Sequence, residues 1–357
     1  MSTLDLSSAF DVVNVELLIR RLQIVGLPSD IVSLVSEWLT TRYFFVSVDG
    51  ESSYVHRLRV GTVQGSILGP ILYALFVCPL FDLAKMTLFA DDNYVIRRSK
   101  HLPELLIEMK LILEIIIKWL TNSGLKVNDG KTEMCLFYRK DTTPVSISIN
   151  GHDIVSKNNM NILGVHFDTK LNWQTHVQTA VTKSNKALQA LRIIRKHFTK
   201  KELLALTVSN YYPILFYNSE IWLLPSLTKT TKNSLLTASA KPLKMCYPAY
   251  NNLVSYNQLH VTLKRATPTS ITNYNHALLL HKVYNSESPN HDWIEIHFNQ
   301  NFNNRLNNAN FHDTSNNKQG KNLLSNRFAT ISNKIPYTWL NMPYKSFKEK
   351  SKLLFLV

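Results

Sequence analysis

The sequence has 357 residues, of which 45% are hydrophobic and 18% are charged. That length allows two or three globular domains. The three cysteines lie far apart without a CxxC pair, so the sequence supports neither a zinc knuckle nor a disulfide framework, and an intracellular setting fits best. The most apolar segment, residues 102–120, carries too many charges for a membrane span: Glu104, Glu108, Lys110, Glu114 and Lys118.

The charge is distributed unevenly. Residues 1–168 hold 16 Lys and Arg against 18 Asp and Glu, and residues 169–357 hold 24 against 7, so the net charges of −2 and +17 sum to the total of +15. This division favours a first half that holds cations and a second half that holds a polyanion. A basic half can also be only a solvated surface, so this signal alone is weak.

Residues 4–6 form a short apolar strand that contains Asp5, and a helix is expected from about residue 15 to residue 22. A carboxylate within an apolar strand needs a partner, because its unpaired burial is costly. A shared metal ion is one possibility. The alternative is a helix N-terminal acid, since Ser7, Ser8 and Asp11 also resemble capping residues.

A second helix is expected over residues 28–39. A hairpin follows, with strands at residues 44–48 and 54–60 around the turn dipeptide Asp49-Gly50.

Residues 61–70 contain three glycines and lead into a helix expected over residues 71–81, with Ser66 as a cap and Pro70 in its first turn. Glycines of this kind let a backbone approach a ligand closely. The alternative is an ordinary glycine-rich connection. The apolar helix that follows is predicted to be buried.

The stretch 87–96 is predicted to be a β-hairpin with Asp91 and Asp92 at its tip. Two adjacent carboxylates repel each other unless a cation lies between them, and oxygen ligands at close quarters suit a divalent metal. An isolated Asp-Asp pair is more often a solvated turn, so the metal-site hypothesis depends on the other motifs.

A long helix is expected over residues 103–122, closed by Gly124 and apolar on almost every side. Lys131 stands at a loop-to-strand junction before a strand at residues 133–138. A further hairpin around residues 145–154 and one strand at residues 162–168 follow.

The second half reads as mostly helical. A helix over residues 177–198 carries a run of Lys and Arg without acids, which raises the odds of a phosphate-contacting surface. Residues 203–247 also look helical, residues 285–333 look irregular, and residues 335–340 belong to a small final helical unit.

Five stretches stand in one order: residues 4–11, 64–70, 89–92, 124–128 with 131–132, and 162–165. Together they resemble the motifs of reverse transcriptases from non-LTR (LINE-like) retrotransposons of the jockey type. Three separate acids, a glycine-rich loop and a basic helix are also the parts of a two-metal phosphoryl-transfer enzyme. Val63 departs from the family, which usually has proline there.

The resemblance implies an α+β fold. It implies a right-hand polymerase palm, with an antiparallel sheet packed on helices, over residues 1–168. A helical thumb over residues 169–250 and an Asn-rich, partly irregular region over residues 251–357 would follow.

The resemblance also implies roles for individual residues. The metal ligands would be Asp5, the Leu6 carbonyl, Asp91 and Asp92, and Lys131 would donate a proton to the leaving pyrophosphate. Phe10 would be the steric gate against ribonucleotides, with Gln64 and Gly65 against the incoming nucleotide. Leu163 and Gly164 would form the primer grip. Contacts to the nucleic-acid backbone would come from Lys183, Lys186, Arg192, Arg195 and Lys196.

By the same resemblance, the expected activity is RNA-directed DNA polymerisation, a nucleotidyl transfer with two Mg²⁺ ions or Mn²⁺ as a substitute. The partners would be an RNA template, a DNA primer or target and deoxynucleotides, in the nucleus and without a membrane.

The family's fingers precede the first catalytic aspartate, so we expect an N-terminally truncated copy that lacks their triphosphate grip. Two alternatives follow. One is a non-catalytic relic that binds nucleic acid through its basic second half, and the other is an RNA-templated RNA polymerase, which Phe10 disfavours.

Overall fold

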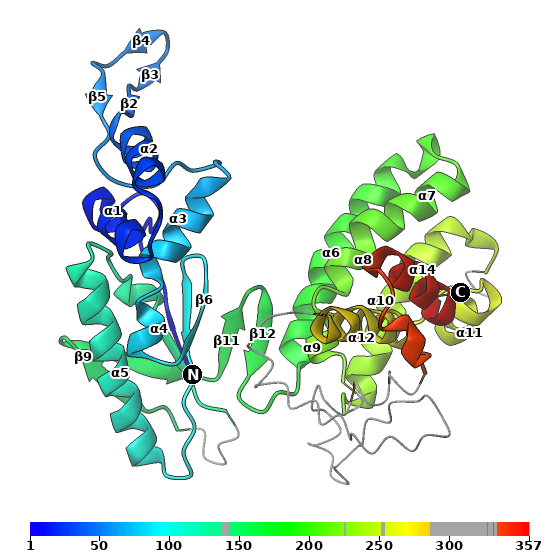
Figure 1. Ribbon diagram of the computed structural model, residues 1–357. Coiled ribbons are helices and arrows are strands. Elements are labelled where there is room, and N and C mark those ends of the chain that lie inside the picture. The colour runs from blue at the N-terminus through cyan, green and yellow to red at the C-terminus, as the bar shows by residue number, and fades with distance from the viewer. Residues whose placement is uncertain are drawn as a thin grey trace. The chain divides into compact units, whose positions relative to one another are not determined.

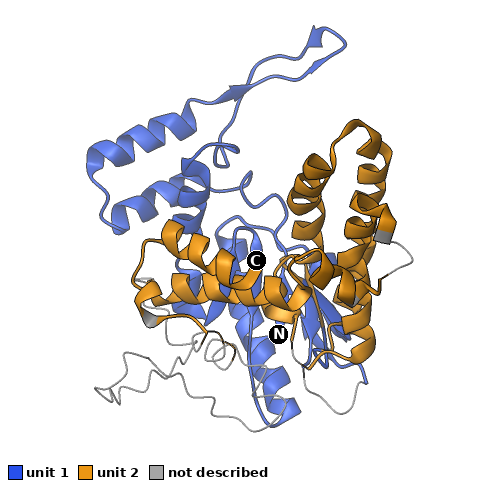
Figure 2. Ribbon diagram, turned by 90° about the vertical axis from the view of Figure 1, so that its right-hand side faces the viewer, with its two compact units in different colours: residues 1–161, 168–171 blue, residues 162–167, 172–357 orange. Residues whose placement is uncertain are grey.

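The computed structural model describes residues 1–137, 143–224, 226–250, 254–285, 327, 331 and 334–356. The chain divides into two compact units. Unit 1 comprises residues 1–161 and 168–171, and unit 2 comprises residues 162–167 and 172–357 (Figure 2). The division at residues 168 and 250 that the resemblance implies stays a prediction.

Unit 1 alternates short strands with helices (Figure 1). Its elements are β1 (Ser2–Leu4), α1 (Val15–Ile24), α2 (Ser29–Thr40), β2 (Tyr43–Phe44), β3 (Ser47–Val48), β4 (Glu51–Ser52), β5 (His56–Arg57), α3 (Leu68–Val77), α4 (Leu80–Leu83), β6 (Met86–Phe89), β7 (Asp92–Val95), α5 (Leu102–Asn122), a 3₁₀ helix (Asp129–Lys131), β8 (Glu133–Cys135), β9 (Ser146–Ile149) and β10 (His152–Lys157). The elements β11 (Asn159–Ile162) and β12 (Val165–Asp168) form a small sheet of their own.

The main sheet of unit 1 has the strand order β6-β7-β1-β8-β10-β9. Its neighbouring strands are antiparallel except for β8 and β10, so the expected antiparallel sheet contains one parallel pair. Leu4 and Val95 from the central strands are fully buried in one core with residues of α1, α2, α3 and α5. The predicted α+β class, with a sheet packed on helices, is therefore confirmed.

Two helix predictions for unit 1 need correction. The helix expected over residues 71–81 is α3, which ends at Val77, and a separate short α4 follows Pro79. Ile71 is also exposed, so α3 is buried on one side only. The helix α5 has the expected bounds, but Ile107 and Leu111 are exposed, and only its other face packs in the core.

The cap of α1 also differs from the expectation. The N-cap is Asn14, whose side-chain oxygen accepts a hydrogen bond from the Leu17 N–H at 3.0 Å. Ser7, Ser8 and Asp11 precede it in a turn, where the left-handed φ of Ser8 reverses the chain. The hairpin expected at residues 44–60 is present, although its strands are broken into the short pairs β2 with β5 and β3 with β4.

Unit 2 is helical. Its elements are α6 (Gln174–Ile194), a 3₁₀ helix (Arg195–His197), α7 (Lys200–Leu206), a π-helix (Thr207–Tyr211), α8 (Tyr212–Leu215), α9 (Ser219–Trp222), α10 (Lys229–Cys246), a 3₁₀ helix (Pro248–Tyr250), α11 (Tyr256–Thr262), α12 (Pro268–Tyr284), a 3₁₀ helix (Tyr337–Trp339) and α14 (Tyr344–Leu356). The helices α6 and α10 pack together, as do α12 and α14.

Two further expectations are corrected here. The single strand predicted over residues 162–168 is broken by a turn between β11, which ends at Ile162, and β12, because Leu163 and Gly164 both take positive φ. The helix predicted over residues 177–198 begins three residues earlier and ends as a 3₁₀ turn. The irregular region predicted over residues 285–333 lies almost wholly outside the described residues. Among the helices described, none combines the length and apolar character that crossing a bilayer requires.

Candidate active site

The acidic hairpin of unit 1 is built as the sequence predicts. Phe89 at the end of β6 pairs with Asp92 at the start of β7, which leaves Ala90 and Asp91 as a two-residue loop. Ala90 takes a left-handed φ of 53°, as the first residue of a tight hairpin turn can. The Asp91 side chain is exposed at the tip, and Asp92 is partly buried beside it.

The strand β1 brings Asp5 to this hairpin. β1 pairs antiparallel with β7, and its last paired residue, Leu4, lies opposite Asn93. β1 ends at Leu4, so the strand expected over residues 4–6 lies at residues 2–4, and Asp5 directly follows it. Asp92 directly precedes Asn93 at the start of β7. The antiparallel pairing therefore sets these two carboxylates, distant in sequence, at the same end of the β1–β7 pair.

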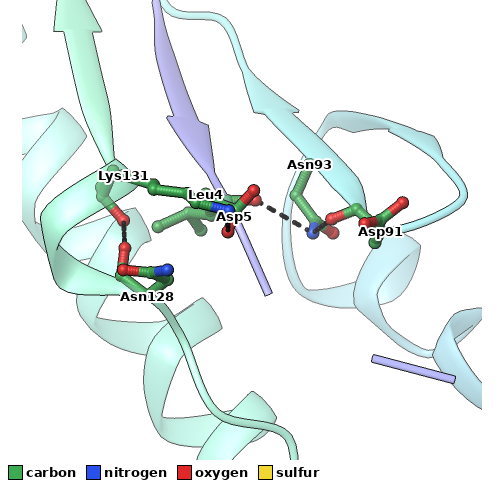
Figure 3. A network of polar contacts seen from close by, with 7 residues as sticks. Leu4, Asp5, Asp91, Asn93, Asn128 and Lys131 are labelled. Atoms are coloured by element: carbon green, nitrogen blue, oxygen red, sulfur yellow. Dashed lines mark hydrogen bonds and ion pairs between the residues drawn. The ribbon is translucent and has the colours of Figure 1, made fainter. Parts of the chain in front are cut away.

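Asn93 ties the turn to β1, and the sequence interpretation did not select it. Its side-chain amide is buried and donates to the Leu4 carbonyl at 3.2 Å and to the Asp91 carbonyl at 2.8 Å (Figure 3). A polar side chain at an inward strand position next to two acids was the signal available in the sequence.

Lys131 is the cationic neighbour of Asp5. Its Nζ lies 3.3 Å from Asp5 Oδ2, with side-chain exposures of 67% for the lysine and 27% for the aspartate. The backbone holds this approach, because the Asn128 N–H donates to the Asp5 carbonyl at 2.8 Å and the Lys131 N–H donates to the Asn128 carbonyl at 3.1 Å (Figure 3). The charged partner that Asp5 needs therefore comes from a segment far along the chain.

The Leu6 carbonyl takes no part in the bridge that Leu6 makes with Val127. The ladder hydrogen bonds there use the Asp5 carbonyl and the Ser7 N–H. Backbone groups alternate along an extended chain, so those of Leu6 face away from Val127. The role of this carbonyl as a metal ligand stays a prediction.

These donors fit a divalent metal in kind, since carboxylate and carbonyl oxygens are the ligands that Mg²⁺ prefers. Asp5, Asp92 and Asp91 come from neighbouring strands and one turn. Within the described residues, however, no three Asp, Glu, His or Cys side chains converge closely enough to hold an ion. The metal site therefore remains a prediction.

Phe10 stacks on a tyrosine of α3. The Phe10 and Tyr73 ring centroids lie 4.4 Å apart with an interplanar angle of 29°. The Tyr73 hydroxyl is buried without a hydrogen-bond partner among the described residues. Burial first, and then the Asp91 carboxylate, raise the pKa of Tyr73 above its ordinary value, so this hydroxyl stays protonated beside the acids.

The glycine-rich loop lies against the loop that carries Phe10. The Thr62 N–H donates to the Phe10 carbonyl at 2.8 Å, and Gln64 Nε2 donates to Asp11 Oδ1 at 2.6 Å. Gly61 has a φ of 83°, and a Cβ there would lie 2.6 Å from the Asp11 carbonyl oxygen. Gln64 and Gly65 thus come shortly after residues 61–62, whose backbone packs closely against the segment that carries Phe10.

Unit 2 holds the other predicted residues. Leu163 and Gly164 form the turn before β12, where the Tyr217 hydroxyl donates to the Leu163 carbonyl at 3.1 Å. Lys183 and Lys186 are exposed on α6, and Arg192, Arg195 and Lys196 follow near its end. At about 100° per residue, Arg192 lies on the opposite side of α6 from Lys183. The predicted backbone-contact residues therefore do not form one row.

Residues 1–167 match the family described as reverse transcriptase (RNA-dependent DNA polymerase). This segment, which makes up 167 of the 357 residues, is therefore similar to a reverse transcriptase domain. The basic residues of unit 2 lie outside the matched segment.

The relatives are retrotransposon proteins. An RNA-directed DNA polymerase from the mobile element jockey of Drosophila melanogaster is 28% identical over 49% of this chain and 20% of its own length. A probable RNA-directed DNA polymerase from transposon BS of the same species is 28% identical over 61% and 26%. The jockey protein of Drosophila funebris is 25% identical over 66% and 27%. The expected resemblance to jockey-type reverse transcriptases is confirmed, and the chain spans about a quarter of such a relative or less.

A solved structure of telomerase from Candida albicans, in complex with a fragment of telomeric RNA, aligns with 74% of this chain and 50% of its own. The identity is 13% and the TM-score is 0.38. This likeness is too low to support a statement about the fold.

Proposed function

We propose that this chain carries the catalytic centre of an RNA-directed DNA polymerase of a non-LTR retrotransposon. The observation that carries the proposal is the pairing of β1 with β7, which places Asp5 and Asp92 at the same end of the two strands, beside the Asp91 turn, within the segment that matches the reverse transcriptase family. Carboxylates gathered in this way suit the binding of cations that neutralise charge on a phosphoryl group in transfer.

In this proposal the acids and the Leu6 carbonyl would hold two Mg²⁺ ions, or Mn²⁺ in their place. The ions would supply the charge neutralisation of two-metal phosphoryl transfer. The primer 3′-hydroxyl forms a bond to the α-phosphorus of a deoxynucleotide while the bond to pyrophosphate breaks. The primer hydroxyl would release its proton to solvent water, and Lys131 would donate one to the leaving pyrophosphate and regain it from solvent.

The remaining residues position the substrates. Phe10, whose ring stacks on Tyr73, would lie under the sugar of the incoming nucleotide and exclude a 2′-hydroxyl. Gln64 and Gly65 would contact the incoming nucleotide, and Leu163 and Gly164 would hold the primer end. The template would be RNA, the primer or target DNA, and the setting the nucleus.

Primer extension on an RNA template, with Mg²⁺ and deoxynucleotides, tests the proposal. Asp91→Asn removes a carboxylate with almost no change in volume, so we expect extension to fall by at least 100-fold while the thermal unfolding midpoint stays within a few degrees. Asp82→Asn is the matched control, because Asp82 is an exposed acid of α4 and not part of the hairpin.

Undiminished extension by Asp91→Asn would refute the role of the acids. No extension by the folded parent chain would favour the relic that only binds nucleic acid. Ribonucleotides supplied alone test the alternative of an RNA-templated RNA polymerase. Robust incorporation would identify such an enzyme and reject Phe10 as a steric gate.

A further inference from the structure

Unit 2 contains an open pocket of about 750 Å³ between the end of α6, the start of α7 and the second half of α10. Half of its twelve lining residues are cationic, and none of the described ones is acidic: Arg192, Arg195, Lys196, Lys200, Lys241 and Lys244. Its volume lies in the range of ligand-binding sites, and its charge selects an anionic ligand. None of these residues lies in the segment that matches the reverse transcriptase family.

Glu202, the acidic residue nearest to these cations in the sequence, forms its hydrogen bonds elsewhere. Glu202 accepts hydrogen bonds from the Thr199 N–H and hydroxyl, both at 2.8 Å, in a capping box at the start of α7. Its carboxylate is therefore engaged with the helix terminus. Glu202 is not among the residues that line the pocket.

Neutral groups contact two of the lysines. Lys241 Nζ donates to Asn185 Oδ1 at 3.2 Å, and Lys200 Nζ lies 3.6 Å from the Tyr247 ring centroid. A hydrogen bond to an amide or a cation–π contact restrains a long side chain without cancelling its charge. Less rotamer entropy is then lost when a phosphate binds.

Aromatic residues favour an unpaired strand over a duplex. Phe198 lines the pocket with 41% of its surface exposed, and Tyr256 lines it from α11. A base can stack on an aromatic ring only when it is unpaired, and basic grooves with aromatic platforms are typical of single-strand binding. Lys183, on the opposite side of α6 from Arg192, lies away from this group.

We propose that this pocket binds a single-stranded segment of nucleic acid through its phosphates, with Phe198 stacking on a base. The site is separate from the acids of unit 1. Its binding does not depend on polymerase activity.

The test uses fluorescence anisotropy with the full chain and a labelled 12-nucleotide uridine RNA. Arg195→Gln combined with Lys196→Gln should weaken binding about tenfold, and the slope of log K against log salt should shrink by about 1.4, which corresponds to two lost contacts at about 0.7 each. Lys345→Gln combined with Lys348→Gln on α14 makes the same charge change and should leave affinity within twofold. Equal losses in both variants, or none in either, would overturn the proposal.

Two further arms separate the possible ligands. Phe198→Ala should weaken binding of the uridine RNA by about fivefold yet leave an abasic strand of equal charge unaffected. If inorganic polyphosphate of equal charge binds as tightly as the RNA and Phe198→Ala changes nothing, the pocket is a phosphate site only and the single-strand assignment fails. A greater effect of the Arg195 and Lys196 changes on a 12-base-pair duplex than on the single strand would also refute it. Asp91→Asn should bind the RNA normally, so loss of polymerisation and loss of this site are distinguishable.

Discussion

At the scale of the residue, the candidate site depends on a neutral amide as much as on its acids. Asn93 is buried between β1 and the Asp91 turn and donates to a carbonyl on each side. Its two N–H groups hold the turn against the strand that carries Asp5. The relative position of the acids therefore rests on a residue that need not touch a substrate.

Asn93→Asp should destabilise unit 1 by about 2 kcal/mol or more, because it removes both donors and sets a carboxylate against two carbonyl oxygens. Urea unfolding measures this change. Asn14→Asp is the control: the Asn14 side chain only accepts a hydrogen bond as a helix cap, and an aspartate does the same. Equal stability of the two variants would contradict the role of the Asn93 amide.

At the scale of the element, the glycine-rich loop is fixed by close backbone packing against the loop that carries Phe10. Gly61 approaches the Asp11 carbonyl so closely that a Cβ would overlap it, and its N–H donates to the Val13 carbonyl at 2.8 Å. The packing of this loop against residues 11–13 therefore fixes the position of the backbone next to Phe10 and of the segment that carries Gln64.

Gly61→Ala should cost more stability than Gly26→Ala. Both glycines have positive φ, 83° and 86°, but a Cβ at Gly26 meets nothing within 4 Å. The Gly26 variant reports backbone strain of about 1 kcal/mol, and the Gly61 variant should lose about 1–3 kcal/mol more by displacing the Asp11 backbone. Equilibrium unfolding of both variants measures the difference. Equal losses of unfolding free energy would show that the Asp11 backbone moves aside without an energetic cost.

Local sequence patterns predicted the helices and strands, but they could not predict which side chains from distant segments would meet in the site. The strand-forming apolar residues on either side of Asp91 and Asp92 predicted the hairpin, and Gly124 predicted the end of α5. The approach of Lys131 to Asp5 and the stack of Tyr73 under Phe10 depend on pairings between distant segments, which no window of sequence contains.

The failures have local causes as well. The strand expected over residues 162–168 was too long because Leu163 joins Gly164 in a left-handed conformation, and Gly164 was the only local sign of a turn. The α3 helix stops near Pro79, whose effect the apolar run concealed. The exposed side of α5 shows that an apolar sequence does not fix which face is buried.

At the scale of the whole molecule, buried histidines are expected to make unit 2 sensitive to acid. Burial, with His166 and Lys183 nearby, lowers the pKa of His176 to about 4, and burial beside Arg327 lowers the pKa of His276 to about 4. Burial also lowers the pKa of His260. All three histidines lie in unit 2.

Unit 2 should lose stability as the pH falls from about 6.5 toward 4, because the unfolded chain takes up protons there that the folded histidines do not. The thermal unfolding midpoint should therefore be lower at pH 5 than at pH 7. His176→Asn, which keeps an acceptor for the His166 N–H, should reduce that drop. The exposed His56→Asn in β5 should leave the drop unchanged, and an undiminished drop in the His176 variant would contradict this account.

The central place of β1 in its sheet has a consequence for the order of folding. Ser2 pairs with Val95 on one side and with Met134 on the other, so the middle of the sheet joins segments about 90 and 130 residues apart. Contacts of such long sequence separation form slowly, because a large loop must close before they stabilise the chain. The β6–β7 hairpin can form early by itself, but Asp5 meets it only when β1 docks, and the acids should therefore assemble in one of the last steps of folding.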